Sequence, residues 1–76
     1  MNAPARPGGV SRVAIPESTR RAVQRATVRF GGVRPLADQI RMGEVAIYDA
    51  LVPMGLMRAA TLKCMQAALR NVGEEP

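Results

Sequence analysis

Apolar residues recur at intervals of three and four along most of the chain, which is the spacing of one face of an α-helix. The first such run has its apolar positions at Ala22, Val23, Ala26 and Phe30. Pro16 suits the first turn of a helix, where its missing N–H costs nothing, and Gly31-Gly32 is a common helix stop. The pattern therefore predicts a first helix from Pro16 through Arg29.

Two short helices separated by a tight turn are predicted in the middle of the chain. The first covers about Arg34 to Arg41 and buries Leu36, Ala37 and Ile40. After the turn at Met42-Gly43, the next helix covers about Glu44 to Val52. Its inward positions are Ile47, Ala50 and Leu51, and its outward positions are Glu44, Val45, Tyr48 and Asp49. A fourth helix is predicted from about Arg58 to Asn71, with an apolar stripe of Leu62, Met65 and Leu69.

The composition fits one small helical domain. The chain has 76 residues, and its apolar residues are mostly small, with one Phe, one Tyr and no Trp, which suits closely packed helices better than a sheet. Residues 1–14 are rich in proline and glycine, which indicates a flexible basic arm, and residues 74–76 are expected to form a solvated tail. We therefore expect an all-α fold, a compact four-helix domain over residues 15–73.

The charge balance points to an anionic partner. The net charge is +5, and ten of the eleven basic residues are arginine. An excess of this size gives a small domain a positive field, which favours nucleic acid, an anionic membrane or an acidic protein. The planar guanidinium also donates two parallel hydrogen bonds to a phosphate. A genomic preference for arginine codons is the alternative explanation for the choice of arginine over lysine.

Several classes of function are disfavoured by what the sequence lacks. Without histidine, the usual zinc sets and any histidine-based triad are absent, and Asp38, Glu44 and Asp49 form no recognisable metal set. Neither an enzyme nor a cofactor is expected. The lone Cys64 cannot form an internal disulfide and is expected to be a buried small residue. No apolar run approaches about 18 residues, so cytoplasm is expected, without a membrane partner.

The segment over residues 33–51, VRPLADQIRMGEVAIYDAL, is the most informative. Its apolar spacing suits two short helices packed across a tight turn, and Ala37 is small where their axes would cross. The longer line RFGGVRPLADQIRMGEVAIYDAL has a Phe-Gly pair, a Leu-Ala pair, a Gly turn and a hydrophobic-Tyr pair. In these features, residues 25–69 resemble the helix-turn-helix of the Cro and λ-repressor-like family, which includes small phage repressors and antidote-type regulators.

The resemblance implies a sequence-specific regulator that binds double-stranded DNA, a repressor of phage or mobile-element type. In this family the second of the paired helices lies in the major groove with its N-terminal residues toward the bases. By this analogy the residues that face DNA bases are Gly43, Glu44, Val45 and Tyr48. Glu44 would accept a hydrogen bond from a cytosine amino group, and Val45 would touch a thymine methyl. Phosphate contacts are expected from Arg34, Arg41, Arg20, Arg21 and Arg25.

Three features depart from the family pattern, and one of them is Ala50, which is small where the family often has a bulky residue. Arg41 stands where the family usually has a turn glycine, and a non-glycine residue with positive φ costs about 1 kcal/mol. A contact between Arg41 and a phosphate would explain an arginine there, as would a turn with a different backbone geometry. The predicted third helix also lacks Arg and Lys and carries Glu44 and Asp49, whose charges repel phosphate.

The run from Leu51 to Met57 is unusually apolar for a loop. Exposed apolar patches often mark partner surfaces, and methionine adapts to many shapes. The preferred interpretation is a homodimer contact through Val52, Met54, Leu56 and Met57. The alternative is that Met54 and Met57 cap the base of the core.

Two other functional interpretations stay open. One is a protein-interaction module on the same scaffold, such as an antidote or a phage-encoded inhibitor, favoured by the acidic third helix and the apolar run. The other is a ribbon-helix-helix protein, in which Val10 to Ile15 forms a strand. Arg12 and Ala14, or Ser11 and Val13, would then read the DNA groove as part of an intertwined dimer. The predicted fourth helix is surplus to that fold and counts against it.

Overall fold

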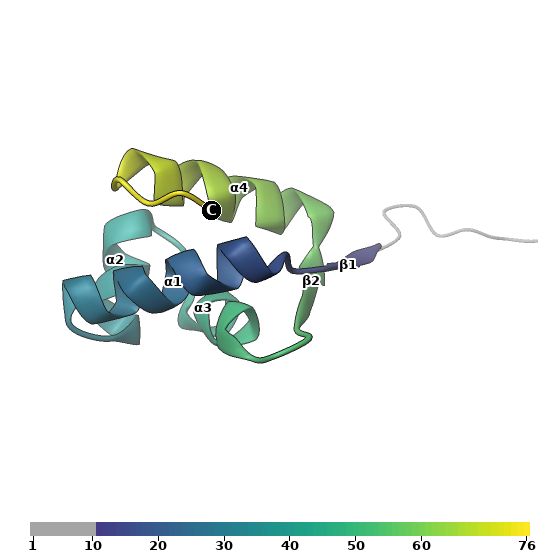
Figure 1. Ribbon diagram of the computed structural model, residues 1–76, viewed down its shortest axis with the longest axis horizontal. Coiled ribbons are helices and arrows are strands. Elements are labelled where there is room, and N and C mark those ends of the chain that lie inside the picture. Colours follow the sequence, from purple (N-terminus) through teal and green to yellow (C-terminus); the bar gives the residue numbers. More distant parts are fainter. Residues whose placement is uncertain (1–10) are drawn as a thin grey trace, which may run out of the picture.

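The computed structural model describes residues 11–76, and this range contains four helices and two short strands (Figure 1). Their order is β1 (Arg12–Ala14), α1 (Glu17–Phe30), α2 (Val33–Ile40), α3 (Glu44–Leu51), β2 (Leu56–Arg58) and α4 (Ala59–Asn71). Each predicted helix is present, with bounds within one residue of the prediction. The fold is therefore mostly helical, as expected, but the small sheet means that it is not all-α. Most of the predicted arm, residues 1–10, lies outside the described residues.

Backbone geometry explains where α1 ends. Gly31 has φ 92°, in the left-handed region, and its N–H donates to the carbonyl of Thr27 over 3.1 Å. Gly32 follows at φ 142° and donates to the same carbonyl over 2.8 Å. Positive φ values of this kind are rare for residues with a side chain. The glycine pair thus turns the chain from α1 into α2, as the sequence predicts.

A three-residue turn, residues 41–43, joins α2 to α3. Arg41 has φ 58° and ψ 45°, so the arginine does occupy the left-handed conformation usually taken by glycine. The Met42 N–H donates to the carbonyl of Ala37 over 3.1 Å and closes the turn. A non-glycine residue in this conformation costs on the order of 1 kcal/mol. The turn is short and fixed, which holds the start of α3 against α2.

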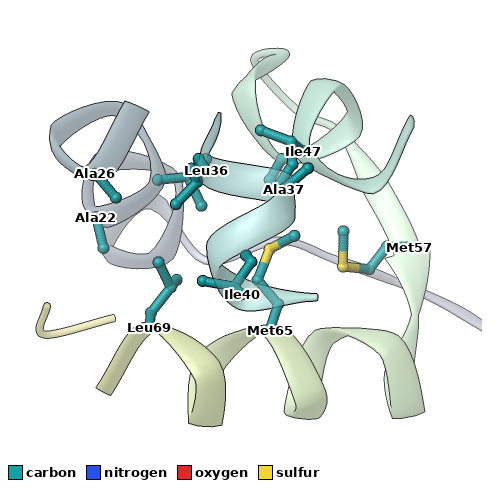
Figure 2. Packing of buried hydrophobic residues seen from close by; sticks show 11 residues of the cluster. Ala22, Ala26, Leu36, Ala37, Ile40, Ile47, Met57, Met65 and Leu69 are labelled. Atoms are coloured by element: carbon teal, nitrogen blue, oxygen red, sulfur yellow. The ribbon is translucent and has the colours of Figure 1, made fainter. Parts of the chain in front are cut away.

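The core is formed where α2 meets the other three helices. Figure 2 shows Leu36 and Ile40 of α2 between the alanines of α1 and the side chains of α4. Ala22, Ala26 and Ala37 are at most 4% exposed, and their small side chains let the helices approach closely. The largest fully buried apolar side chains are Leu36, Ile47, Met65, Leu69 and Val23. The inward positions predicted from helical spacing therefore do form the core.

Strands β1 and β2 pair antiparallel, with Arg12 opposite Arg58, Val13 opposite Met57 and Ala14 opposite Leu56. The Ile15 N–H continues the ladder to the carbonyl of Gly55 over 3.2 Å. Residues 12–14 thus belong to the folded domain rather than to a free arm. Because β1 pairs within its own chain, the intertwined ribbon of a ribbon-helix-helix dimer is not what this strand forms.

The C-terminal residues pack against α1 instead of forming a solvated tail. The Glu74 N–H donates to the carbonyl of Leu69 over 2.9 Å, and the Glu74 side chain is only 7% exposed. The carbonyl of Pro76 accepts hydrogen bonds from Ser18 Oγ and Thr19 Oγ1 over 2.7 and 3.1 Å. The folded unit therefore extends beyond the predicted boundary at residue 73.

Candidate functional site

The outward face of α3 carries two large apolar side chains that lie outside the core. Val45 and Tyr48 are 72% and 53% exposed, on the helix whose opposite side buries Ile47 and Ala50. Residues three positions apart share one face of a helix, so Val45 and Tyr48 form a single surface. The structure thus exposes these two of the four predicted base-facing residues, as helical spacing requires.

Arg34 and Glu44, two predicted site residues, contact each other across the junction of α2 and α3. Arg34 Nε lies 3.5 Å from Glu44 Oε2, and both side chains are substantially exposed. An ion pair this exposed adds little stability. Its main effect is to offset the negative charge of Glu44, which reduces the repulsion that this end of α3 would otherwise exert on phosphate.

The predicted phosphate ligands Arg20 and Arg21 are paired with Glu17 in the first turn of α1. Arg20 Nε donates to Glu17 Oε1 over 3.0 Å, and Arg21 Nε donates to Glu17 Oε2 over 3.4 Å. The hydrogen bond from Arg20 is the main reason why the pKa of Glu17 lies below its usual value. These guanidiniums therefore offer an anion less net charge than the sequence alone implies.

Arg25, the third predicted ligand on α1, is held with Arg29 by the buried Glu74. Arg25 Nε donates to Glu74 Oε1 over 2.9 Å, and Arg29 Nη1 donates to Glu74 Oε2 over 2.7 Å. The hydrogen bond from Arg25, aided by that from Arg29, lowers the pKa of Glu74 despite its burial. Sequence reasoning missed this clamp. The available signal was the spacing of Arg25 and Arg29, one helical turn apart, with an acidic pair at the C-terminus.

A groove runs along α3 beside β2 and the first turns of α4. It consists of two neighbouring cavities of about 290 and 400 Å³, which share Ala46 and Thr61 in their walls. The smaller cavity is also lined by Arg12, Val45, Asp49, Met57 and Arg58. The larger is also lined by Arg41, Met42, Gly43, Ala60 and Cys64. Of the predicted DNA-binding residues, Arg41, Gly43 and Val45 come together here, and the predicted dimer-interface residue Met57 also lines the smaller cavity.

The arginines of this groove lack the acidic partners that the α1 arginines have. Within residues 11–76, no carboxylate oxygen lies within 4.0 Å of a guanidinium nitrogen of Arg12, Arg41 or Arg58. Arg58 was not among the predicted site residues, because its place beside α3 depends on the unforeseen strand β2. Unpaired positive charge therefore lines the groove beside α3.

The apolar surface after α3 is smaller than predicted. Val52, Met54 and Leu56 are 52%, 94% and 50% exposed, as a contact surface requires. Met57 is only 3% exposed and packs in the core between α3 and α4 (Figure 2), so its assignment to a dimer interface is wrong. Strand alternation is the reason, since successive side chains point to opposite faces. Cys64, expected to be buried, is exposed.

Two kinds of feature, a metal-binding cluster and a membrane-spanning helix, are not found in the part of the chain that the structure describes. There, no three His, Cys, Asp or Glu side chains gather in a way that would hold a metal ion. None of the helices in residues 11–76 combines the length and apolar character needed to span a bilayer. Comparison of the chain with protein-family models, curated proteins and solved structures finds no match.

Proposed function

We propose that this protein binds double-stranded DNA, with α2, the turn at residues 41–43 and α3 acting as a helix-turn-helix. The observation that carries the proposal is the position of α3. A short turn fixes its first residues, its outward face is free of the core, and unpaired arginines border it. A helix that enters the major groove needs these properties, because its exposed residues read bases while flanking cations hold phosphates.

Each proposed contact follows from side-chain chemistry. Val45 is placed to touch a thymine methyl, and Glu44 to accept a hydrogen bond from a cytosine amino group. Gly43 has open space where a β-carbon would be, so the backbone can approach DNA closely there. Arg41 and Arg34 would bind phosphates, and Tyr48 would reach or pack beside one. In this arrangement the pair between Arg34 and Glu44 also orients the carboxylate before DNA arrives.

The proposed biological role is sequence-specific regulation of transcription, as a repressor that acts as a homodimer. Val52, Met54 and Leu56 form the proposed dimer contact, because together they expose apolar surface that the monomer leaves uncovered. A two-fold dimer would place one α3 in each of two successive major grooves. Its operator would then be a two-fold repeat with half-sites about one helical turn apart.

Selection from a random duplex pool at several salt concentrations tests the proposal. We expect one sequence to be enriched as a two-fold repeat, with an affinity that falls as salt rises because bound arginines release counterions. Val45→Ala should change or abolish the selected sequence. Val28→Ala, which truncates an even more exposed valine on α1, should leave it unchanged. Binding that shows no enrichment and disappears at moderate salt would contradict a sequence-specific role.

The second candidate function is a protein-interaction module on the same scaffold. The exposed apolar side chains of Val45 and Tyr48, with Asp49 nearby, also suit a protein partner. This function predicts tight binding to a protein and weak, sequence-independent binding to DNA. Reversing the charge of Arg34 and Arg41 separates the two candidates. The variant loses activity if the partner is DNA and keeps it if the partner is a protein.

A further inference from the structure

The two-stranded ribbon of β1 and β2 has one face in the core and one face in solvent. Val13 and the buried Met57 form its inward pair, whereas Arg12 and Arg58 are exposed directly opposite each other. Directly opposed residues of an antiparallel pair lie about 4.5–5.5 Å apart at their α-carbons. The fold thus brings two guanidiniums from distant parts of the sequence onto one small outward surface.

This arrangement is unfavourable for the free protein. Like charges directly opposite each other destabilise a strand pair. Among the described residues no carboxylate lies within 4.0 Å to relieve Arg12 or Arg58. Asp49 lines the same cavity but forms no ion pair with either of them. By contrast, Glu74 binds two arginines of α1 at once.

The opposed arginines lie beside the proposed reading helix. Arg12 and Arg58 line the same cavity as Val45 and Asp49, which belong to the outward half of α3. In a major-groove complex, the sugar-phosphate strands run along both sides of the inserted helix. A pair of guanidiniums at the side of α3 is therefore placed against one of these strands.

We propose that Arg12 and Arg58 form a phosphate clamp that holds the DNA strand bordering the groove in which α3 lies. This inference rests on the proposed DNA-binding function. The phosphodiester supplies the negative charge that the free protein lacks at this position, so binding converts a repulsive pair into two charge-assisted contacts. The clamp carries no sequence information and fixes how α3 sits in the groove.

The salt dependence of binding to a random-sequence duplex of 20 base pairs tests the clamp. Each phosphate contact contributes about 0.9 to the slope of log affinity against log salt concentration. Arg12→Gln and Arg58→Gln should each reduce the slope by about 0.9, and the double variant by about 1.8. The matched control is Arg70→Gln, which removes an exposed arginine at the far end of α4, about 18 Å along that helix. It should leave the slope unchanged.

Thermal melting supplies a second, independent measurement. The single Gln variants should melt at the same temperature as the native protein or higher, because they remove a like-charge contact. A double variant that keeps the native slope would overturn the clamp, and an equal loss for Arg70→Gln would overturn it as well. If the double variant keeps the slope while Val45→Ala still abolishes sequence selection, the clamp alone fails. If the native protein does not bind the duplex, both proposals fail.

Discussion

At the scale of single residues, the backbone geometry at Gly55 and at Arg41 limits which residue can occupy each position without strain. Gly55 lies in the turn before β2, where its N–H donates to the carbonyl of Val52 over 3.0 Å. A β-carbon at this position would overlap the carbonyl oxygen of Asp49. Because the obstacle is backbone, it cannot rotate away as a flexible side chain would. Gly55 is therefore needed to bring β2 close to the end of α3.

Gly55→Ala should lower the free energy of unfolding by about 2 kcal/mol or more, the range expected for steric strain in a packed turn. Urea denaturation followed by circular dichroism measures the change. Gly43→Ala is the control, because Gly43 has open space around it and an ordinary φ of −70°. It should cost at most about 1 kcal/mol, from its helix-capping position. Equal losses for the two variants would show that the overlap at Gly55 is relieved by movement.

Arg41 combines backbone strain with the proposed contact to phosphate. Arg41→Gly should raise the free energy of unfolding by about 0.5–1 kcal/mol, because glycine adopts the left-handed conformation without a steric penalty. The same variant should bind duplex DNA more weakly, with a salt slope reduced by about 0.9. Denaturation and salt titration on the same preparation measure both effects. A variant that is more stable but binds DNA with the native affinity and salt slope would show that Arg41 is not part of the interface.

At the scale of elements, the helices were predicted, β1 was expected only in the ribbon-helix-helix alternative, and β2 was not predicted. The apolar stripe of α1 repeats over 14 residues and a glycine pair marks its end, and the 8 residues of α2 have their apolar positions at helical spacing, so spacing located both helices. Each strand has only three residues and one inward side chain, which is too short for an alternating pattern to be recognised. Missing β2 led directly to the wrong assignment of Met57 and to the omission of Arg58.

The candidate site was also predictable only in part. Exposure of Val45 and Tyr48 follows from positions on a single helix, and the structure agrees. The partners of Arg25 and Arg29 depend on contacts 49 and 45 residues away, which local pattern does not reveal. Local spacing therefore identified which faces are free, whereas the distribution of unpaired charge required the tertiary structure.

The ion pairs of Glu74 with Arg25 and Arg29 should make the free energy of unfolding depend on pH in the acid range. The pKa of folded Glu74 is below its usual value because Arg25 and Arg29 bind the ionised form. Its stabilisation is therefore fully present above the usual carboxyl pKa, near 4.5, and is lost as pH falls toward the lowered value. Glu74→Gln should cost about 1–2 kcal/mol at neutral pH and flatten the acid side of the stability profile.

The control for this clamp is Glu75→Gln. Glu75 is adjacent and exposed, and its side chain forms no ion pair among residues 11–76. Thermal melting between pH 3 and pH 7 compares the two variants. A Glu74→Gln profile that keeps the native acid slope would show that other carboxyl groups cause the pH dependence.

At the scale of the whole molecule, the net charge of +5 is unevenly compensated. Glu17 and Glu74 each contact two of the four arginines of α1, whereas Arg12, Arg41 and Arg58 beside α3 have no carboxylate oxygen within 4.0 Å in the described residues. Within residues 11–76, positive charge without a paired carboxylate is therefore present on the side where the exposed face of α3 lies, and also at Lys63 and Arg70 of α4. Positive charge beside α3 attracts an anionic partner toward this face.

The proposed dimer belongs to this scale. Met54→Glu should convert a dimer into a monomer, because it places a charge in an apolar contact, while the melting temperature of the fold stays near the native value. Val28→Glu introduces the same charge on α1, where the native valine is also highly exposed, and should leave the dimer intact. Light scattering after size-exclusion chromatography gives the mass of each variant. A native protein that is monomeric at all concentrations would contradict the dimer.

The packing of the last residues on α1 also has a consequence for the order in which the protein folds. Ser18 bonds to a carbonyl 58 positions further along the chain, and the carboxylate of Glu74 reaches arginines almost as distant. Contacts this remote in sequence form late, because closing a long loop costs chain entropy. On the ribosome, Arg25 and Arg29 emerge well before the carboxylate that holds them. While the chain is being made, the positive charges of Arg25 and Arg29 therefore lack the carboxylate that pairs with them in the folded protein. They are paired only once Glu74 has been made.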